Sequence, residues 1–168
     1  DLIPIIETAK GMQAVHEIAS AGTRTRRMAF GAGDFTLDMN MTWSRDETEL
    51  LAPRVAVVQA SRAAGIEPPI DTVWADLNDV EGFKASAVRC RALGFQGKMC
   101  IYPPQVTVVN DVFTPGPAEV ALAAKMVDAF AEAEKTGLAS IQVDGKFIDY
   151  PIVYRAQQVS TGRSVALK

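Results

Sequence analysis

The sequence has few of the residues that build the commonest catalytic and metal centres. It contains one histidine, His16, and two cysteines, Cys90 and Cys100, in 168 residues. His16 falls within a predicted helix, so the chain offers no Ser-His-Asp or Cys-His catalytic set and no zinc ligand set. The cysteines stand in separate apolar segments and form no CxxC pair. This cysteine usage favours a reducing, cytoplasmic setting.

Long apolar runs and an excess of positive charge are also missing. The chain has 17 Lys and Arg against 20 Asp and Glu, with no basic run of the kind that nucleic-acid binding needs. No apolar stretch approaches the roughly 20 residues that span a bilayer, and residues 1–4 lack the pattern of a signal peptide. With 48% hydrophobic residues there is enough material for a core. We expect a folded chain with no nucleic acid and no membrane as partner.

Short apolar runs alternate with helical patterns over the first two thirds of the chain. Strands are predicted at residues 2–6, 28–30, 71–75 and 97–102, and helices at 9–21, 47–64 and 79–93. Asp79 is the predicted N-cap of the third helix, and Gly65 and Gly94 are the predicted stops. The polar segment 34–46 is predicted as a long loop. This alternation predicts an α/β fold with parallel strands.

The pattern changes after Phe113. The sequence Thr-Pro-Gly-Pro at 114–117 breaks the chain, and an amphipathic helix is predicted over 118–135. Apolar runs on either side of Asp144 and Gly145 predict a hairpin, and Pro151 suits the first turn of a last helix over 152–159. We expect residues 1–113 to form βα repeats and residues 114–168 to form an appended helix-hairpin-helix element.

Polar residues follow each predicted strand, where ligands bind in both architectures that four βα units allow. These architectures are half of an eight-unit barrel and a small doubly wound domain. Glu7 and Asp34 follow neighbouring strands and should meet at one rim. Two carboxylates with waters and substrate oxygens are a common way to hold Mg²⁺. The alternative is that both are helix-initiating acids that accept from backbone N–H groups.

The segment Gly31-Ala32-Gly33 lies just ahead of Asp34. Glycine lets a backbone approach a ligand closely, so these amides are candidates for holding a substrate carboxylate. A GxG pair without a third glycine is a weak nucleotide signal, and the alternative is a simple turn.

Several stretches taken together resemble the citrate lyase beta-subunit-like branch of the HpcH/HpaI aldolase family. The likeness runs nearly end to end and rests on the order and spacing of five motifs. They are Ile5-Ile6-Glu7-Thr8-Ala9, Phe30-Gly31-Ala32-Gly33-Asp34-Phe35, Ala92-Leu93-Gly94-Phe95-Gln96-Gly97-Lys98, Val109-Asn110-Asp111-Val112-Phe113-Thr114-Pro115 and Val143-Asp144-Gly145-Lys146-Phe147-Ile148-Asp149-Tyr150-Pro151.

The resemblance implies a (β/α)8 TIM barrel with a C-terminal lid. The chain matches the C-terminal half of that barrel, strands five to eight, in residues 1–113, and the helix-hairpin-helix lid in residues 114–168. The half that carries the family's catalytic arginine and much of its coenzyme A site has no counterpart in these residues. We therefore expect a fragment that is inactive and poorly soluble by itself.

The resemblance also assigns site residues. It makes Glu7 and Asp34 the Mg²⁺ ligands, and it makes Asp149 the lid acid/base that reaches into a neighbouring subunit's barrel. From the residues alone, Asp149 is instead a helix N-cap ahead of Pro151. Pro103 is expected to contact substrate, because Tyr-Pro-Pro-Gln at 102–105 stands where the family often has His-Pro-x-Gln. The family commonly has an acidic residue at the position of Gly33.

These assignments predict a Mg²⁺-dependent carbon–carbon lyase. Its substrate would be a 3-hydroxy acyl thioester of the malyl-CoA, citramalyl-CoA or citryl-thioester type, carried by CoA or an acyl-carrier protein. A homo-oligomer, trimer or hexamer, would complete each site with a neighbouring lid. The alternatives are a non-catalytic barrel fragment or assembly subunit, and an aldolase acting on a hydroxy-oxo acid without CoA.

Overall fold

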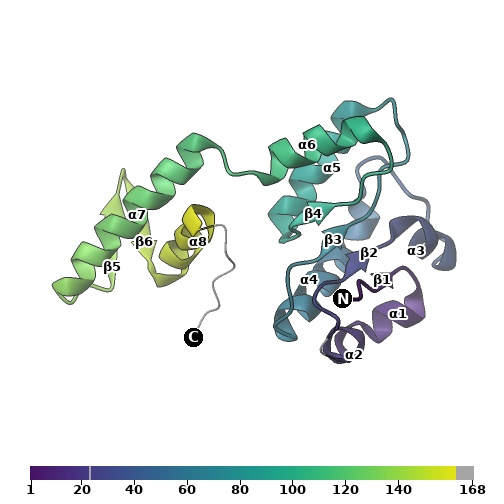
Figure 1. The fold of residues 1–168 in the computed structure, drawn as a ribbon, viewed down its shortest axis with the longest axis horizontal. Helices are drawn as coiled ribbons and strands as arrows, with labels where there is room; N and C mark the ends of the chain where they lie inside the picture. Colours follow the sequence, from purple (N-terminus) through teal and green to yellow (C-terminus); the bar gives the residue numbers. More distant parts are fainter. Residues whose placement is uncertain (23, 162–168) are drawn as a thin grey trace. The chain divides into compact units, whose positions relative to one another are not determined.

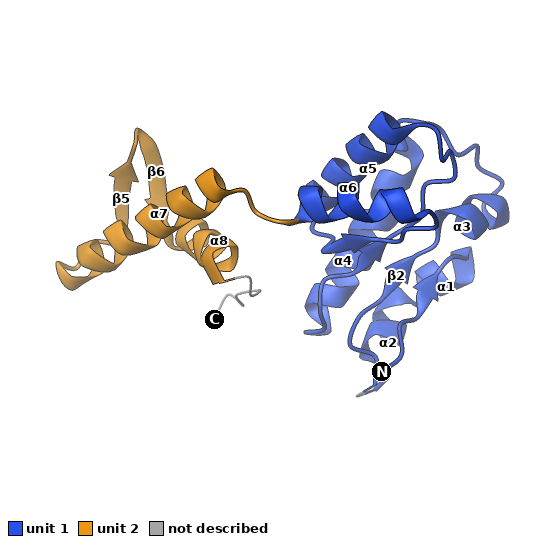
Figure 2. Cartoon of the chain, turned by 45° about the horizontal axis from the view of Figure 1, so that its top comes forward, with its two compact units in different colours: residues 1–113 blue, residues 114–168 orange. Residues whose placement is uncertain are grey.

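A computed structural model describes residues 1–22 and 24–161, and the chain divides into two compact units. Unit 1 comprises Asp1–Phe113 and unit 2 comprises Thr114–Lys168 (Figure 2). Across the described part of the chain, none of the helices has the length and apolar character needed to cross a membrane.

Unit 1 is built on a four-stranded parallel sheet with the strands in chain order (Figure 1). The strands are β1 (Ile5–Ile6), β2 (Ala29–Phe30), β3 (Ile70–Asp71) and β4 (Gly97–Lys98). Ile6 pairs with Phe30, Ala29 with Ile70, and Asp71 with Lys98, all in parallel. The carboxyl ends of all four strands therefore lie along one edge. The predicted α/β fold with parallel strands is confirmed.

The strands are shorter than predicted. β1 and β2 begin later than expected, whereas β3 and β4 end earlier than expected. Residues 71–75 were expected to be a strand, but β3 ends at Asp71 and the next side chain, Thr72, accepts a hydrogen bond from Ala32 N at 2.9 Å. Leu2 makes only an isolated bridge with Thr25. The strand lengths predicted from apolar β-branched runs were therefore too long.

Five helical segments occupy the three regions predicted as helices. They are α1 (Ala9–Gln13), α2 (Val15–Ser20), the 3-10 turn η1 (Thr48–Leu50), α4 (Leu51–Ala63) and α5 (Val80–Leu93). The predicted helix 9–21 is divided at Ala14, which caps α1 and opens α2. The prediction for α5 is confirmed: Asp79 accepts from Gly82 N at 2.9 Å, and Gly94 ends the helix with φ +104°.

Two helices of unit 1 were missed. α3 (Ala32–Asp38) begins directly after β2, in the segment expected to be a loop, and it buries Phe35 and Thr36. α6 (Pro103–Phe113) begins at two prolines, directly after the segment predicted as the fourth strand. Proline is tolerated in the first helical turn, where its missing N–H has no intrahelical role.

The core of unit 1 lies between the sheet and its helices. Ile6 and Phe30 are fully buried there, whereas Ile5 on the opposite face of β1 is 48% exposed. The other buried members of this core come from α2, the loop before β2, α3, η1, α4, α5 and the residues after α5. They include Val15, Ala19, Met28, Phe35, Leu50, Val57, Ala60, Cys90 and Phe95.

Unit 2 has a core of its own. It consists of α7 (Pro117–Lys135), the antiparallel hairpin β5 (Ser140–Val143) and β6 (Lys146–Asp149), and α8 (Tyr150–Thr161). Phe130, Ile148 and Val153 are its most buried side chains. Asp144 and Gly145 both have positive φ, at 49° and 77°, as a two-residue type I′ turn requires. The predicted long helix and hairpin are confirmed.

Candidate functional site

The two predicted metal ligands follow adjacent strands at the same edge of the sheet. Glu7 comes directly after β1, and Asp34 lies in the first turn of α3, which directly follows β2. Gly31 N donates to Ile6 O at 3.0 Å, so the residues that lead into both carboxylates are joined by the sheet itself. Glu7 is half-buried and Asp34 is exposed.

Gly31 makes room for the Glu7 carboxylate. A Cβ atom at position 31 would stand 2.8 Å from Glu7 Oε2 and 2.9 Å from Ile5 Cγ2, closer than real Cβ contacts come. The backbone there has φ −110°, which any residue can adopt, so the requirement for glycine is one of space. The glycine therefore lets the Glu7 side chain lie over the β2–α3 junction, towards the helix that carries Asp34.

This pair suits a hard, oxygen-seeking cation. Within residues 1–22 and 24–161, no three His, Cys, Asp or Glu side chains gather as a metal cluster. Zinc sites usually take three or four protein ligands, whereas Mg²⁺ is commonly bound by one or two carboxylates and keeps several waters or substrate oxygens. Glu7 and Asp34 fit the second pattern.

The backbone amides ahead of Asp34 are not equally available. The Gly31 amide donates to Ile6 O, and the Ala32 amide donates to Thr72 Oγ1. Neither can also orient a substrate carboxylate without losing its partner. Of the three amides expected to hold a substrate carboxylate, that of Gly33 is therefore the remaining candidate. Gly33 is exposed in the first turn of α3.

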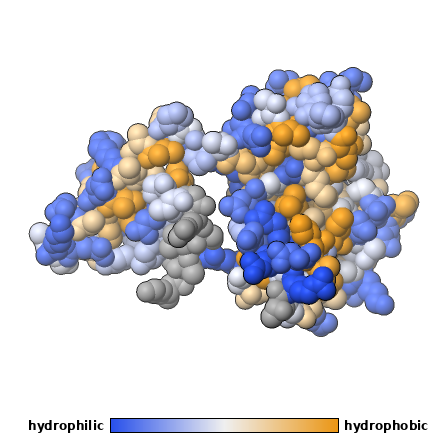
Figure 3. Space-filling model, viewed as in Figure 1, coloured by the Kyte–Doolittle hydropathy of each residue, from blue (hydrophilic) through white to orange (hydrophobic). Residues whose placement is uncertain are grey.

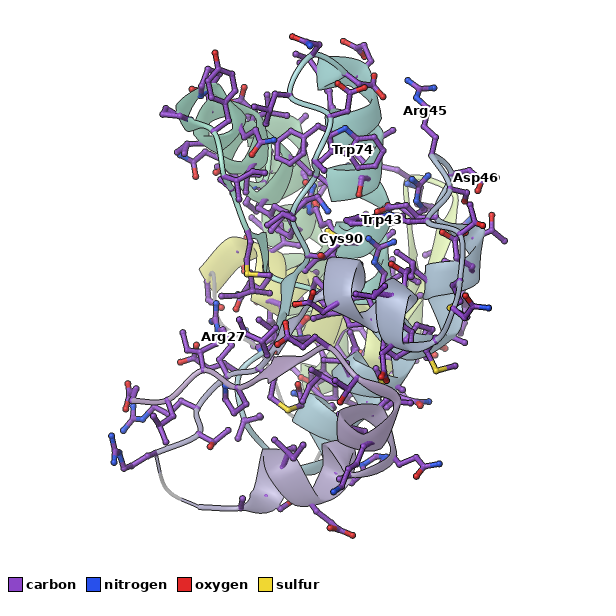
Figure 4. The ribbon with its side chains drawn as sticks, turned by 90° about the vertical axis from the view of Figure 1, so that its right-hand side faces the viewer. Arg27, Trp43, Arg45, Asp46, Trp74 and Cys90 are labelled. Carbon is purple, nitrogen blue, oxygen red and sulfur yellow. The ribbon has the colours of Figure 1, made fainter. Side chains whose placement is uncertain are left out.

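A hollow of about 340 Å³ lies between the loop after α3 and the loop after β3. Its walls include Trp43, Arg45 and Trp74, which Figure 4 shows on neighbouring segments of unit 1. Trp74 is only 5% exposed. Among the described residues, none accepts a hydrogen bond from its indole Nε1. Arg45 donates two hydrogen bonds to the carboxylate of Asp79, at 2.8 and 2.9 Å. These bonds, with one from the Gly82 amide, lower the pKa of Asp79 to about 2.

A buried ionic network, which was not predicted from the sequence, lies beneath the edge of the sheet. Arg54 of α4 bonds both Asp71 and Glu47, and Lys98 bonds Asp71 Oδ2 at 2.7 Å. All four of these side chains are fully buried. Burial alone would raise the pKa of Glu47, but the hydrogen bonds and charge of Arg54, with a bond from Ser86, lower it. Two carboxylates and two cations compensate each other.

The sequence of α4 contains a pattern from which this network could have been predicted. Arg54 lies in register with Leu50, Val57 and Ser61, which are buried on the same helical face. A cation inside an apolar stripe needs a buried partner, and Asp71 and Lys98 stand inside apolar strand runs in the same way.

The predicted residues Asp149 and Pro103 lie in different units. Asp149 ends β6 in unit 2 and its Oδ1 accepts from Ile152 N at 3.4 Å, which is the capping contact expected for this residue. Pro103 is the exposed first residue of α6 in unit 1. Gln105 of the same motif is buried, accepting from Ile101 N and donating to Trp74 O, and so it holds the turn after β4.

Comparison with known proteins identifies the family of this chain. The model of the family HpcH/HpaI aldolase/citrate lyase matches residues 1–103. The chain belongs to this family. It is 39% identical to citrate lyase subunit beta of Leuconostoc mesenteroides subsp. cremoris over 158 residues, which are 94% of the chain and 52% of that protein. It is 32% identical to mitochondrial citramalyl-CoA lyase of Rattus norvegicus, over 96% of the chain and 50% of the relative.

A solved structure resembles the chain in both fold and sequence. This is the protein CitE from Mycobacterium tuberculosis in complex with magnesium, acetoacetate and coenzyme A. It superimposes with a TM-score of 0.78 at 27% identity, over 97% of this chain and 61% of that one. This chain of the HpcH/HpaI family spans about half the length of the curated relatives that it matches.

Proposed function

We propose that unit 1 supplies four strands of a (β/α)8 barrel in a Mg²⁺-dependent carbon–carbon lyase. The open face of the sheet supports this proposal. Ile3 and Ile5 are 54% and 48% exposed, and Figure 3 shows hydrophobic residues on the visible face of unit 1. In a closed barrel, side chains on this face of the strands fill the interior. The shorter span of the chain relative to its relatives agrees with the proposal.

The proposed Mg²⁺ ligands are Glu7 and Asp34. The observation that carries this assignment is the pair of carboxylates after adjacent parallel strands, with Gly31 leaving space for one of them. Magnesium in the solved CitE complex is consistent with the same cofactor here. When bound, Mg²⁺ stabilises negative charge on the oxygen that interconverts between hydroxyl and carbonyl.

The proposed reaction splits a 3-hydroxy acyl thioester, such as citramalyl-CoA or malyl-CoA. The bond between C2 and C3 breaks, the C3 hydroxyl loses its proton and becomes a carbonyl, and the thioester fragment leaves as an enolate. That enolate takes up a proton at carbon. Asp149 from unit 2 of a neighbouring copy is the proposed acid/base, which takes the proton from the hydroxyl and delivers it to the enolate carbon. Gly33 and Pro103 are proposed to contact the substrate.

The test is made in the full-length protein with a panel of CoA thioesters. Glu7→Gln and Asp34→Asn should each abolish Mg²⁺-dependent release of acetyl-CoA, because each removes a charged ligand oxygen and no core volume. Glu17→Gln, on the exposed side of α2, makes the same change of charge and should leave turnover intact. Full activity of the two ligand variants at saturating Mg²⁺ would disprove the assignment.

A further inference from the structure

The first amide of α1 is held by a side chain from another βα unit. Ala9 N donates to Asp38 Oδ2 at 2.7 Å, across 29 residues of sequence. The first amides of a helix have no partner inside the helix and need one from outside. Thr8 Oγ1 accepts from Gly11 N at 3.0 Å, so Thr8 and Asp38 share the capping of α1.

Both residues at the ends of this hydrogen bond are close in sequence to the proposed metal ligands. Ala9 follows Glu7 by two residues. Asp38 follows Asp34 by four, which places both on one side of α3, a single turn apart. The bond therefore connects Glu7 to Asp34 along a path that runs through Ala9, Asp38 and α3.

The other end of α3 is also anchored from outside. Ala32 N donates to the buried hydroxyl of Thr72 at 2.9 Å. Asp34 thus sits between two external hydrogen bonds, one to β3's end and one to the segment that carries Glu7. The bond of Asp38 joins the two ligand-bearing segments directly through a side chain.

We propose that Asp38 is a positioning residue for the metal site, which fixes the separation of the Glu7 and Asp34 carboxylates before the cation binds. This inference rests on the proposed function of those two residues. A cation held by two ligands on separate segments must order both, and a preformed link removes part of that cost. Groups that orient metal ligands commonly contribute about 10- to 100-fold to metal affinity.

The experiment measures Mg²⁺ binding by isothermal titration calorimetry in the full-length protein without substrate. Asp38→Ala should weaken binding about tenfold, the lower end of that range, because Asp38 is exposed. Asp38→Asn keeps an oxygen that can accept from Ala9 N and should stay within about twofold of the parent protein. Asp38→Ser, with a side chain too short for the link, is a second variant that should match Asp38→Ala.

Two controls separate positioning from simple helix capping. Thr8→Val removes a cap from the same end of α1 but no contact with α3, and should leave Mg²⁺ affinity within about twofold. Hydrogen exchange of the Ala9 amide without metal should speed up in Asp38→Ala and remain slow in Asp38→Asn. Equal loss of affinity in Thr8→Val and Asp38→Ala would overturn the inference.

The outcome for Glu7→Gln distinguishes this inference from the proposed function. If Glu7→Gln abolishes Mg²⁺ binding and Asp38→Ala leaves it unchanged, only the role of Asp38 is wrong. If the parent protein binds no Mg²⁺, or Glu7→Gln binds it normally, the proposed metal site is wrong and the role of Asp38 falls with it.

Discussion

Arg54 and Asp71 form a two-pronged ion pair inside unit 1, with Nε to Oδ1 at 2.8 Å and Nη2 to Oδ2 at 2.9 Å. Both side chains are fully buried. A planar guanidinium matches a carboxylate in this geometry, which a lysine cannot reproduce. The pair joins α4 to the end of β3, immediately before Thr72, whose hydroxyl holds the start of α3. Asp71 of the network is thus adjacent in sequence to the residue that holds the start of the helix carrying Asp34.

Removing Arg54 should destabilise the protein strongly. Arg54→Met leaves Glu47 and Asp71 buried with too little positive charge, and breaking a buried pair in this way costs about 3–5 kcal/mol. Urea unfolding measures the loss. Arg62→Met, at the exposed end of the same helix, is the matched control and should cost far less. Similar unfolding midpoints for the two variants would contradict a structural role for the network.

Adding one methyl group at Gly31 should impair the metal site. Gly31→Ala places a Cβ 2.8 Å from Glu7 Oε2, so the carboxylate must move away from the β2–α3 junction. We expect a rise of about tenfold or more in the Mg²⁺ concentration that gives half-maximal activity. Gly22→Ala is the control, since Gly22 lies outside the site and its Cβ would meet nothing within 4 Å. If Gly22→Ala has the larger effect, the spatial argument for Gly31 is wrong.

The Arg45–Asp79 pair should support stability in a pH-dependent way. The pKa of Asp79 is lowered to about 2, below its ordinary value of about 4, so its contribution is present above pH 4 and is lost as the pH falls towards 2. Arg45→Gln removes the main cause of the shift. Its melting temperature should lie below that of the parent protein by a constant amount above pH 5. The difference should shrink between pH 4 and pH 3, and a difference that is constant down to pH 3 would contradict this.

The proposed sharing of a site between copies predicts complementation. Glu7→Ala and Asp149→Ala proteins should each be inactive, because one lacks a metal ligand and the other lacks the proton donor. Mixed and allowed to exchange subunits, they should regain part of the activity, since some sites then combine an intact Glu7 with an intact Asp149. Native mass spectrometry monitors the exchange. Exchange without recovered activity would leave Asp149 as the cap of α8 that its contact with Ile152 N makes it.

The order of the strands and of most helices could be predicted from the sequence, but the lengths of the strands could not, and α3 and α6 were missed. Capping residues and glycine stops located α5 correctly, because Asp79 and Gly94 act through local backbone chemistry. The strands were overestimated because β-branched apolar residues continue past β3 to Trp74, which is buried outside the sheet. Burial, rather than strand pairing, selects those residues.

The candidate site was predictable only in part, for a similar reason. Glu7 and Asp34 are acids that stand directly after apolar runs, and a local pattern reveals them. The hydrogen bond between Ala9 and Asp38 joins two βα units and depends on α3, a helix that lies in a segment predicted as a loop. The partners of Arg54 are likewise fixed only by the packing of α4 against the sheet.

The buried network also determines how unit 1 comes apart. Its members come from the turn before η1, from α4, from the ends of β3 and β4, and, through Ser86, from α5. Opening any one of these segments by itself would leave an uncompensated charge in an apolar interior. Partial unfolding inside this region is therefore costly, and residues 47–98 should melt together as a single cooperative block.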